Sequence, residues 1–314
     1  MLDFLYPPLE WRDWRDDWPL SRCSQFANSS GLRWHYQKLG QGPVILLLHG
    51  TGASTHTWRD LVPIWANAFT VISVDLPGHA FTPTQDARHL SLPGMAVAVM
   101  QLMADLQLQP QVIVGHSAGA AVAAQMVLTA PPENRPLLVA LNPAWLPMPG
   151  MAGWLFAPAA KLITLNPTSA WLMAKQAARG SLVARVMRGT GSQLTPEGLG
   201  YYKRLFSAPA HVRGVLAMMV GWDLAAWHAQ LEKLNSPVLI LCGDKDQTVD
   251  PESTLPLSQR LPQAEHAMLP ALGHLAHEEA PREVAQRVTD WVLRAREGTA
   301  RSAESPHGSA SPPH

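Results

Sequence analysis

Ser117 stands in the sequence pattern that best suits a catalytic nucleophile. It is the central residue of G-H-S-A-G at positions 115–119, which fits the motif G-x-S-x-G. The apolar run 112–114 predicts a strand before the serine, and the alanine-rich segment 120–128 predicts a helix after it. A sharp turn between a strand and a helix exposes a serine and admits only small residues beside it. We therefore predict a nucleophilic serine; the alternative is a serine in an ordinary glycine-flanked turn.

A nucleophilic serine needs a base that removes its proton and a carboxylate that orients the base. The apolar run 238–242 predicts a buried strand. Three aspartates lie in the segment after that strand: Asp244, Asp246 and Asp250. Two histidines precede the last predicted helix. We expect His274 to accept the proton of Ser117 and His277 to hold a structural position at the start of that helix. The reverse assignment is the alternative.

These motifs resemble those of the α/β-hydrolase superfamily. In that superfamily the chain order is serine, then acid, then histidine, as it is in this sequence. The resemblance implies that Asp246 is the acid, because it follows the predicted strand as the aspartate of G-x-x-D does in the superfamily. Asp244 and Asp250 are then solvated loop residues. The fold class implied is α/β, with a mostly parallel eight-stranded sheet, flanking helices and an inserted helical cap.

A second loop resembles the oxyanion hole of the superfamily. The sequence H-G-T-G-A at 49–53 follows the apolar run 43–48. In α/β-hydrolases an H-G-x loop donates one backbone N–H, and the residue after the nucleophile donates another. The resemblance therefore implies Thr51 and Ala118 as donors, with Gly52 as the alternative to Thr51. Such donors stabilise the charge of a tetrahedral intermediate, and one is typically worth about 3 kcal/mol.

The segment 75–82 resembles the D-x-x-G-x-G-x-S turn of the superfamily, with two departures. Ala80 stands at the second glycine and Thr82 at the serine. We expect these departures to alter the turn beside the pocket slightly and to leave the catalytic residues unaffected. His49, at the start of the oxyanion loop, is expected to brace that loop rather than to act as a base.

Strand and helix signals alternate along most of the chain, which predicts a parallel sheet with helices on both faces. The strands are expected at 32–37, 44–48, 70–74, 112–114, 137–141 and 238–242, and helices near 58–67, 94–106 and 281–296. From 143 to 235 the strand signal stops, and helical runs rich in tryptophan and methionine follow. We predict a Trp-rich N-terminal arm (1–22), a core (23–142 and 236–296), a helical cap (143–235) and a disordered tail (297–314).

Composition excludes several classes of protein. The 314 residues carry 24 basic and 24 acidic side chains, so no electrostatic attraction to nucleic acid is expected. Two cysteines form no disulfide framework and indicate a reducing compartment. The sequence shows neither a secretory signal nor an apolar run long enough for a transmembrane segment. We expect a cytoplasmic protein without a metal site or cofactor. The tryptophan-rich arm packs on the domain or, as the alternative, rests peripherally on a membrane.

A narrower resemblance combines five segments of the chain. They are 49–60, 115–121, 211–219, 222–224 and 273–279, and together they resemble the magnesium-chelatase accessory family. The resemblance covers most of residues 10–290. It implies a role near the insertion of magnesium into protoporphyrin, in the bacteriochlorophyll biosynthesis of phototrophic bacteria. It does not identify a reaction.

Two classes of function follow from these observations. The first is a serine hydrolase that acts on an ester-type bond of a small apolar molecule. The second is a protein that binds a porphyrin or assembles with magnesium chelatase subunits, on a hydrolase scaffold. The abundance of tryptophan and methionine in the cap favours a flat apolar ligand. We predict that Trp222 and Met218 contact this ligand.

Overall fold

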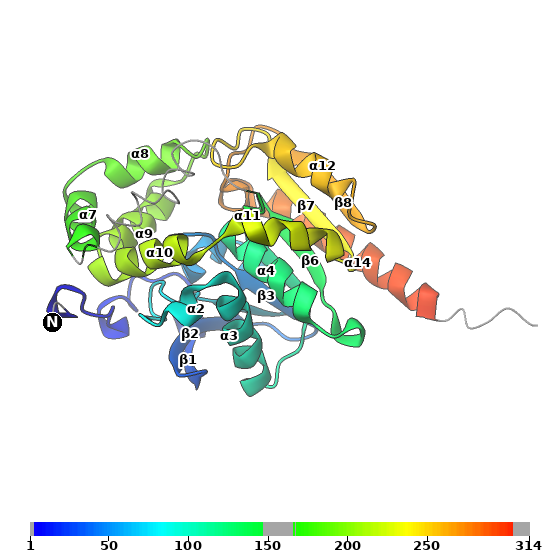
Figure 1. Cartoon of the computed structure of the whole chain (residues 1–314), viewed down its shortest axis with the longest axis horizontal. Helices are drawn as coiled ribbons and strands as arrows, with labels where there is room; N and C mark the ends of the chain where they lie inside the picture. Colours follow the sequence, from blue (N-terminus) through cyan, green and yellow to red (C-terminus); the bar gives the residue numbers. More distant parts are fainter. Residues whose placement is uncertain (1–2, 147–165, 167, 304–314) are drawn as a thin grey trace, which may run out of the picture.

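The sheet organises the molecule. The structure is a computed structural model that describes residues 3–146, 166 and 168–303. Eight strands lie in the order β1-β2-β4-β3-β5-β6-β7-β8 (Figure 1). They are β1 (Ser24–Ser29), β2 (Leu32–Leu39), β3 (Val44–Leu48), β4 (Thr70–Val74), β5 (Pro110–His116), β6 (Leu137–Leu141), β7 (Val238–Gly243) and β8 (Ala264–Leu269). β2 pairs antiparallel with β1 and β4, and the other neighbours are parallel. The prediction of a mostly parallel eight-stranded sheet is confirmed.

Helices cover both faces of the sheet, which is why the central strands are mostly apolar. Along β3, Leu46 and Leu48 join the core on one face of the sheet, whereas Ile45 and Leu47 join the core on the other face. Outside the cap the helices are α1 (Val62–Trp65), α2 (Ala87–Leu90), α3 (Leu92–Asp105), α4 (Ala118–Thr129), α12 (Leu255–Ser258), α13 (Ala276–Glu279) and α14 (Pro281–Ala303). Short 3-10 turns are η4 (Thr55–Trp58), η5 (Pro132–Asn134) and η7 (Pro251–Thr254).

Helices also form the described part of the predicted cap. Between β6 and β7 lie α7 (Ser169–Arg179), α8 (Leu182–Arg188), α9 (Pro196–Phe206), α10 (Pro209–Gly221), α11 (Leu224–Trp227) and η6 (His228–Lys233). Figure 1 shows α7, α8 and α9 grouped at one end of the molecule, with α10 running from them over the sheet. The stretches 147–165 and 167 of the predicted cap lie outside the described residues.

The N-terminal arm packs onto the domain. Its 3-10 turns are η1 (Asp3–Leu5), η2 (Trp11–Asp13) and η3 (Ser21–Cys23). The rings of Trp11, Trp14 and Trp18 surround Phe81 edge-on, with ring centroids 5.0, 5.5 and 5.3 Å away. Such aromatic contacts add to the free energy of burial. These tryptophans are therefore engaged within the protein, which is the packed arrangement that the sequence favoured over an arm resting on a membrane.

One predicted boundary is wrong. The last helix was expected to end at 296 and a disordered tail to begin at 297, but α14 continues to Ala303. Gly298 is the least favourable residue for a helix before Ala303, and a glycine costs a formed helix about 1 kcal/mol, too little to end it. The rest of the predicted tail, 304–314, lies outside the described residues. Among the helices of the described residues, none has the length and apolar composition needed to cross a bilayer.

Candidate active site

Ser117 lies at the tight turn between β5 and α4. Its backbone has φ 52° and ψ −116°, a conformation that residues with a side chain rarely adopt. The surrounding backbone holds it there, because its N–H donates to the carbonyl of Leu141 at 3.0 Å. The two flanking glycines are needed for space. A Cβ on Gly115 would lie 2.4 Å from the Gly119 carbonyl oxygen, and one on Gly119 would lie 2.1 Å from that of Leu48.

The structure brings together the serine, histidine and aspartate that the sequence singled out. The Oγ atom of Ser117 lies 3.0 Å from Nε2 of His274, and Nδ1 of His274 lies 2.7 Å from Oδ2 of Asp246. All three side chains are buried. Because a carboxylate accepts at Nδ1, that nitrogen carries the hydrogen, and Nε2 is left to accept the hydroxyl proton. This arrangement can activate a serine hydroxyl for attack on a carbonyl carbon.

The surroundings of Asp246 keep its carboxylate ionised. Oδ1 accepts the backbone N–H groups of Thr248 and Val249, and Oδ2 also accepts the side-chain amide of Asn142 at 2.8 Å. Burial alone would raise the pKa of Asp246, but the hydrogen bond and charge of His274, with these further donors, lower it below its ordinary value. The sequence analysis did not predict a role for Asn142. Its position, a polar side chain directly after the apolar run 137–141, is the one sequence feature that could have indicated it.

The alternative acids and the alternative histidine have other partners. Asp244 accepts the N–H of Ala271, and Asp250 caps η7 by accepting the N–H of Glu252. The ring nitrogen Nε2 of His277 lies 2.7 Å from the hydroxyl of Thr57. Burial lowers the pKa of His277 well below its ordinary value, so its ring is neutral. His277 thus has the structural position that the sequence predicted for it.

The H-G-T-G loop lies against the serine. A Cβ on Gly50 would be 3.1 Å from Cβ of Ser117. The N–H of Ala53 donates to the carbonyl of Gly50 at 3.1 Å, and Gly52 has φ 75°, as the third residue of a type II turn requires. Within the described part of the chain, the backbone N–H groups of Thr51 and Ala118 donate to no protein acceptor. Both groups are thus available to an oxyanion.

Two buried histidines fix this loop from opposite sides. His49 accepts the N–H of Leu76 at Nε2, so its Nδ1 carries the hydrogen that it donates to the Gly50 carbonyl at 2.8 Å. This is the bracing role that the sequence predicted. His211 comes from cap helix α10 and donates from Nε2 to the carbonyl of Gly52 at 3.1 Å. The cap therefore holds the oxyanion loop directly, through a residue to which the sequence gave no role.

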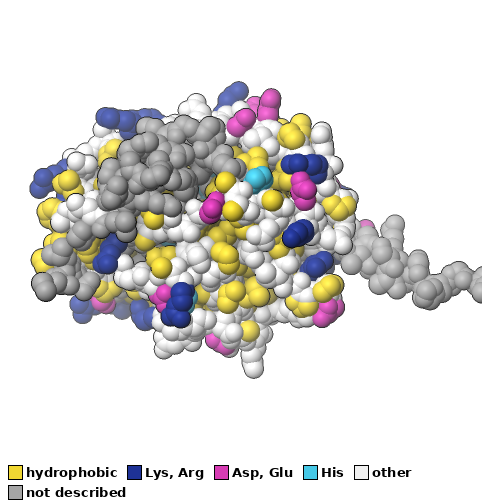
Figure 2. Space-filling model, viewed as in Figure 1, with side chains coloured by type: hydrophobic (Ala, Val, Ile, Leu, Met, Phe, Trp, Pro, Cys, Tyr) yellow, Lys and Arg dark blue, Asp and Glu magenta, His cyan; other side chains and the backbone are white. Residues whose placement is uncertain are grey.

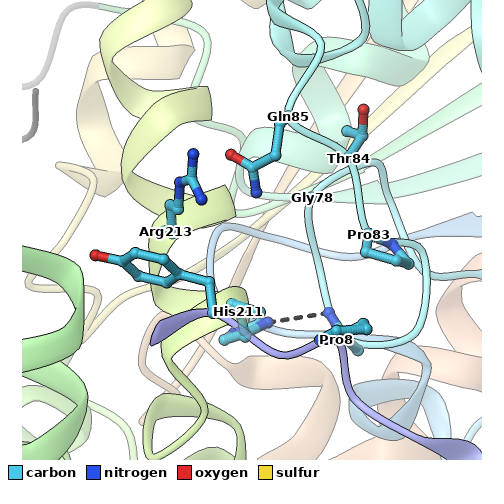
Figure 3. A pocket seen from close by; sticks show the side chains of 10 residues that line it. Pro8, Gly78, Pro83, Thr84, Gln85, His211 and Arg213 are labelled. Atoms are coloured by element: carbon cyan, nitrogen blue, oxygen red, sulfur yellow. Dashed lines mark hydrogen bonds between the residues drawn. The ribbon is translucent and has the colours of Figure 1, made fainter. Parts of the chain in front are cut away.

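His211 also borders a cavity of about 300 Å³ (Figure 3). Its Nδ1 accepts the N–H of Ala80 at 3.0 Å, the bond drawn dashed in the figure. Burial lowers the pKa of His211 to about 3, so the ring stays neutral and keeps both bonds. The cavity lies between the arm, the loop after Gly78 and α10, and Ser117 is not among its lining residues. Arg213 reaches into it beside Gln85, with its guanidinium over the ring of Tyr6.

The two predicted ligand contacts, Met218 and Trp222, are buried in packing contacts. Met218 is 1% exposed and belongs to the main core. Trp222 is 7% exposed, and its indole N–H donates to the carbonyl of Leu90 at 2.9 Å. Neither residue lines the cavity beside His211. Both side chains pack α10 onto the domain. Large apolar residues occur in a core as readily as on a ligand-binding surface, so composition does not distinguish the two positions. Among the described residues, no cluster of histidine, cysteine and acidic side chains could hold a metal ion.

Known proteins share this fold over most of the chain. The family model described as alpha/beta hydrolase fold matches residues 43–281. The chain is 31% identical to the magnesium-chelatase 30 kDa subunit of Rhodobacter capsulatus, over 88% of this chain and 96% of that protein. It is 26% identical to the pimeloyl-[acyl-carrier protein] methyl ester esterase of Aeromonas hydrophila, over 82% and 98%.

A solved structure agrees with these sequence matches. An alpha/beta hydrolase fold protein from Burkholderia ambifaria superposes with a TM-score of 0.69 and 22% identity, over 91% of this chain and 99% of the other. At this identity the likeness concerns the fold alone. The family match and the long match to the chelatase subunit carry the assignment further. The chain therefore belongs to the alpha/beta hydrolase fold family and, within it, resembles the magnesium-chelatase accessory proteins.

Proposed function

We propose that this protein is a serine hydrolase that cleaves an ester-type bond of an apolar substrate, with Ser117 as nucleophile. The observation that carries the proposal is the bonded series Ser117, His274 and Asp246 at a strained turn. Strain at a single residue persists where the fold over-determines it, and such residues gather at active sites. The similarity to an esterase over 98% of that protein's length is consistent with this chemistry.

The proposed reaction has two halves. In the first, the Ser117 hydroxyl proton moves to Nε2 of His274 while Oγ bonds to the ester carbonyl carbon. The N–H groups of Thr51 and Ala118 stabilise the negative oxygen that forms. The C–O bond to the alcohol then breaks, and the alcohol leaves with the proton held by His274. In the second half a water molecule repeats the attack on the acyl-serine, releases the acid and restores the Ser117 hydroxyl.

Labelling with a fluorophosphonate tests the nucleophile. The wild-type protein is expected to react with the probe, and Ser117→Ala to lose the reaction while remaining folded. Ser24→Ala is the matched control, because Ser24 also bonds to a buried histidine, His35, at 3.0 Å. That variant is expected to react as the wild type does. A folded wild-type protein that stays unlabelled would remove the main support for catalysis. A substrate panel with apolar esters then defines the bond that is cleaved.

We further propose that the protein serves as an accessory factor of magnesium chelatase in bacteriochlorophyll biosynthesis, within the cytoplasm. The support is the similarity to the 30 kDa chelatase subunit over nearly its whole length. Both cysteines are free, which suits a reducing compartment. The proposed partners are chelatase subunits and a small apolar molecule such as a porphyrin. Nucleic acid is not a proposed partner.

A non-catalytic role on the same scaffold is the second candidate, favoured by the same similarity to a chelatase subunit. Reconstituted chelatase with protoporphyrin and magnesium separates the two. If catalysis is required, wild-type protein stimulates the chelatase and Ser117→Ala does not. If the protein acts by assembly or by presenting the porphyrin, both forms stimulate it equally. A porphyrin bound directly would quench tryptophan fluorescence saturably, with a dissociation constant on the order of micromolar.

A further inference from the structure

Cap helix α7 presents two large apolar side chains to solvent, whereas its Trp171 is half-buried against a core cluster. Its inner face is made of the buried alanines Ala170, Ala174 and Ala177. On the outer side, Leu172 is 53% exposed and Met173 is 39% exposed. An amphipathic helix of a globular protein normally does the reverse and buries its large apolar residues. The outer side of α7 therefore has the composition of a surface that meets an apolar environment.

Helix α8 also exposes apolar side chains on its outer side. Val183 and Ala184 are buried, whereas Leu182 is 37% exposed and Val186 is 52% exposed. Among the described residues, ten large hydrophobic side chains are exposed, and four of them lie on α7 and α8. Scattered exposed apolar residues are ordinary on protein surfaces, but this concentration on two neighbouring short helices is not.

The charges on these two helices are all positive. They are Lys175, Arg179, Arg185 and Arg188. Among the described residues none of the four pairs with a carboxylate. The sequence has no aspartate or glutamate between Glu133 and Glu197, although the whole chain has 24 acidic and 24 basic residues. Figure 2 shows basic side chains along the edge of the molecule where Figure 1 places α7 and α8.

Basic and apolar side chains alternate on the same outer faces. On α7, Leu172, Lys175 and Arg179 follow the spacing of one helix side, and so do Leu182, Arg185 and Val186 on α8. We propose that these two faces bind the surface of a membrane that contains anionic phospholipids. The arginine and lysine heads pair with lipid phosphates, and the leucine, valine and methionine side chains enter the boundary between headgroups and acyl chains.

An anionic membrane fits these faces better than an acidic protein does. Attraction to an acidic protein accounts for the charges but leaves the long apolar side chains without a reason to lie among them. A lipid surface satisfies both kinds of side chain at once. This proposal does not depend on catalysis by Ser117, and it uses the cap rather than the N-terminal arm, whose tryptophans pack around Phe81.

Sedimentation of the full-length protein with vesicles tests the proposal. Vesicles of phosphatidylcholine mixed with phosphatidylglycerol are expected to carry the protein down, whereas vesicles of phosphatidylcholine alone are expected to leave it in solution. Raising the salt to 1 M, where the Debye length is about 3 Å, should release most of it. A wild-type protein that ignores the phosphatidylglycerol vesicles, or binds both kinds equally, overturns the proposal.

Two pairs of substitutions place the binding on α7 and α8. Arg185→Glu with Arg188→Glu should weaken binding about 25-fold or more, since each basic residue near an anionic surface contributes about fivefold. Arg282→Glu with Arg296→Glu, two exposed arginines of α14, is the matched control and should bind as the wild type does. Equal loss in both pairs would mean general charge attraction and would overturn the assignment to the cap.

The apolar contribution needs its own variant. Leu172→Ser with Val186→Ser removes two exposed apolar side chains and keeps every charge. It should weaken binding to phosphatidylglycerol vesicles while fluorophosphonate labelling and circular dichroism stay at wild-type levels. Unchanged vesicle binding would contradict the insertion of these side chains. If fluorophosphonate labelling is lost while vesicle binding is retained, the result contradicts the proposed catalysis and does not contradict the proposed membrane binding.

Discussion

The molecule contains two sets of serine, histidine and aspartate side chains that are bonded in the same way. In one, Ser117 lies 3.0 Å from His274, which lies 2.7 Å from Asp246. In the other, Ser24 lies 3.0 Å from His35, which lies 2.7 Å from Asp75. The distances are the same, so bond geometry alone does not distinguish a candidate catalytic set from a structural one.

The surroundings of the two serines differ. Ser117 has φ 52° on a turn at the start of a helix, whereas Ser24 has φ −73° and ψ 132°, the ordinary conformation of an extended strand. Ser24 also accepts a bond from the side chain of Gln37, and the ring of His35 lies against three aromatic rings. Beside Ser117 lie two backbone N–H groups that have no acceptor among the residues that the structure describes. The comparison teaches that the elbow and its free donors, rather than the three side chains, mark the candidate site.

Removing each histidine should separate the two sets most strongly. His274→Ala is expected to lower kcat by about four to six orders of magnitude, because the proton acceptor is lost. His35→Gln should leave kcat within about twofold and lower the thermal midpoint, since it disturbs a buried structural bond. Esterase kinetics and thermal unfolding of each variant measure the two effects. If His35→Gln does not fold, Ser24→Ala takes its place.

The assignment of the base is open to a direct contradiction. His277→Gln should retain most of the activity, because His277 bonds to Thr57. A variant of His277 that is inactive, beside an active His274→Ala, would show that the other histidine is the base.

In the described part of the chain, six other buried histidines have no carboxylate partner, and they predict how the free energy of unfolding depends on pH. They are His49, His56, His79, His116, His211 and His277. Burial lowers the pKa of each, to about 4 for His79 and about 3 for His116 and His211. In the unfolded chain these histidines bind protons near pH 6.5. Below that pH the unfolded chain therefore binds more protons than the folded state does.

The free energy of unfolding should therefore fall as pH drops from 6.5 towards 4. Each such histidine contributes about 1 to 2 kcal/mol between pH 6.5 and 5. Urea unfolding at a series of pH values measures the slope. His116→Asn should flatten it, whereas His228→Gln, which changes a histidine outside the core, should not. A stability that is constant from pH 7 to 5 would contradict the neutral burial of these rings.

The strand ends explain what the sequence could predict. Ser117, Asp246 and the H-G-T-G loop each follow an apolar run, and parallel strands place their carboxyl ends at one edge of the sheet. The edge strands β1 and β8 were not located, because their half-exposed sequences mix polar and apolar residues without a clear period. Strands that are buried on both faces have continuous apolar runs, and these runs located them in the sequence. The edge strands β1 and β8 are defined by their pairing with a neighbour, and their sequences did not locate them.

Contacts between distant segments could not be predicted. His211 meets Gly52 across 159 positions, and Asn142 meets Asp246 across 104. No local sequence motif marks either contact, because the packing of the cap and of the sheet determines which residues meet. The prediction that Trp222 and Met218 contact a ligand rests on composition in the same way. Composition records that a side chain is apolar, and only the fold determines whether it faces the core or a ligand.

His211 provides a smaller test, confined to the candidate site. As a positioning residue, it acts on the oxyanion loop through the Gly52 carbonyl. His211→Phe should lower kcat about tenfold with little change in KM, a fraction of what losing an oxyanion donor costs. His211→Gln, which can still donate, should restore much of the loss. A change in KM alone would indicate a role in binding rather than in holding the loop.

Asn142 should give the smallest effect. Its amide donates to Oδ2 of Asp246, the same oxygen that accepts from His274. Asn142→Ala removes one neutral donor to a carboxylate that still has His274 and two backbone N–H groups, so the pKa of Asp246 should rise only slightly. We expect kcat to fall about threefold to tenfold, with the acidic limb of the pH–rate profile moved to higher pH. Gln37→Ala, which removes a donor to Ser24 in the other set, should leave that profile unchanged. An equal shift in both variants would mean that the two sets are coupled through the sheet, and that the elbow does not by itself set the active serine apart.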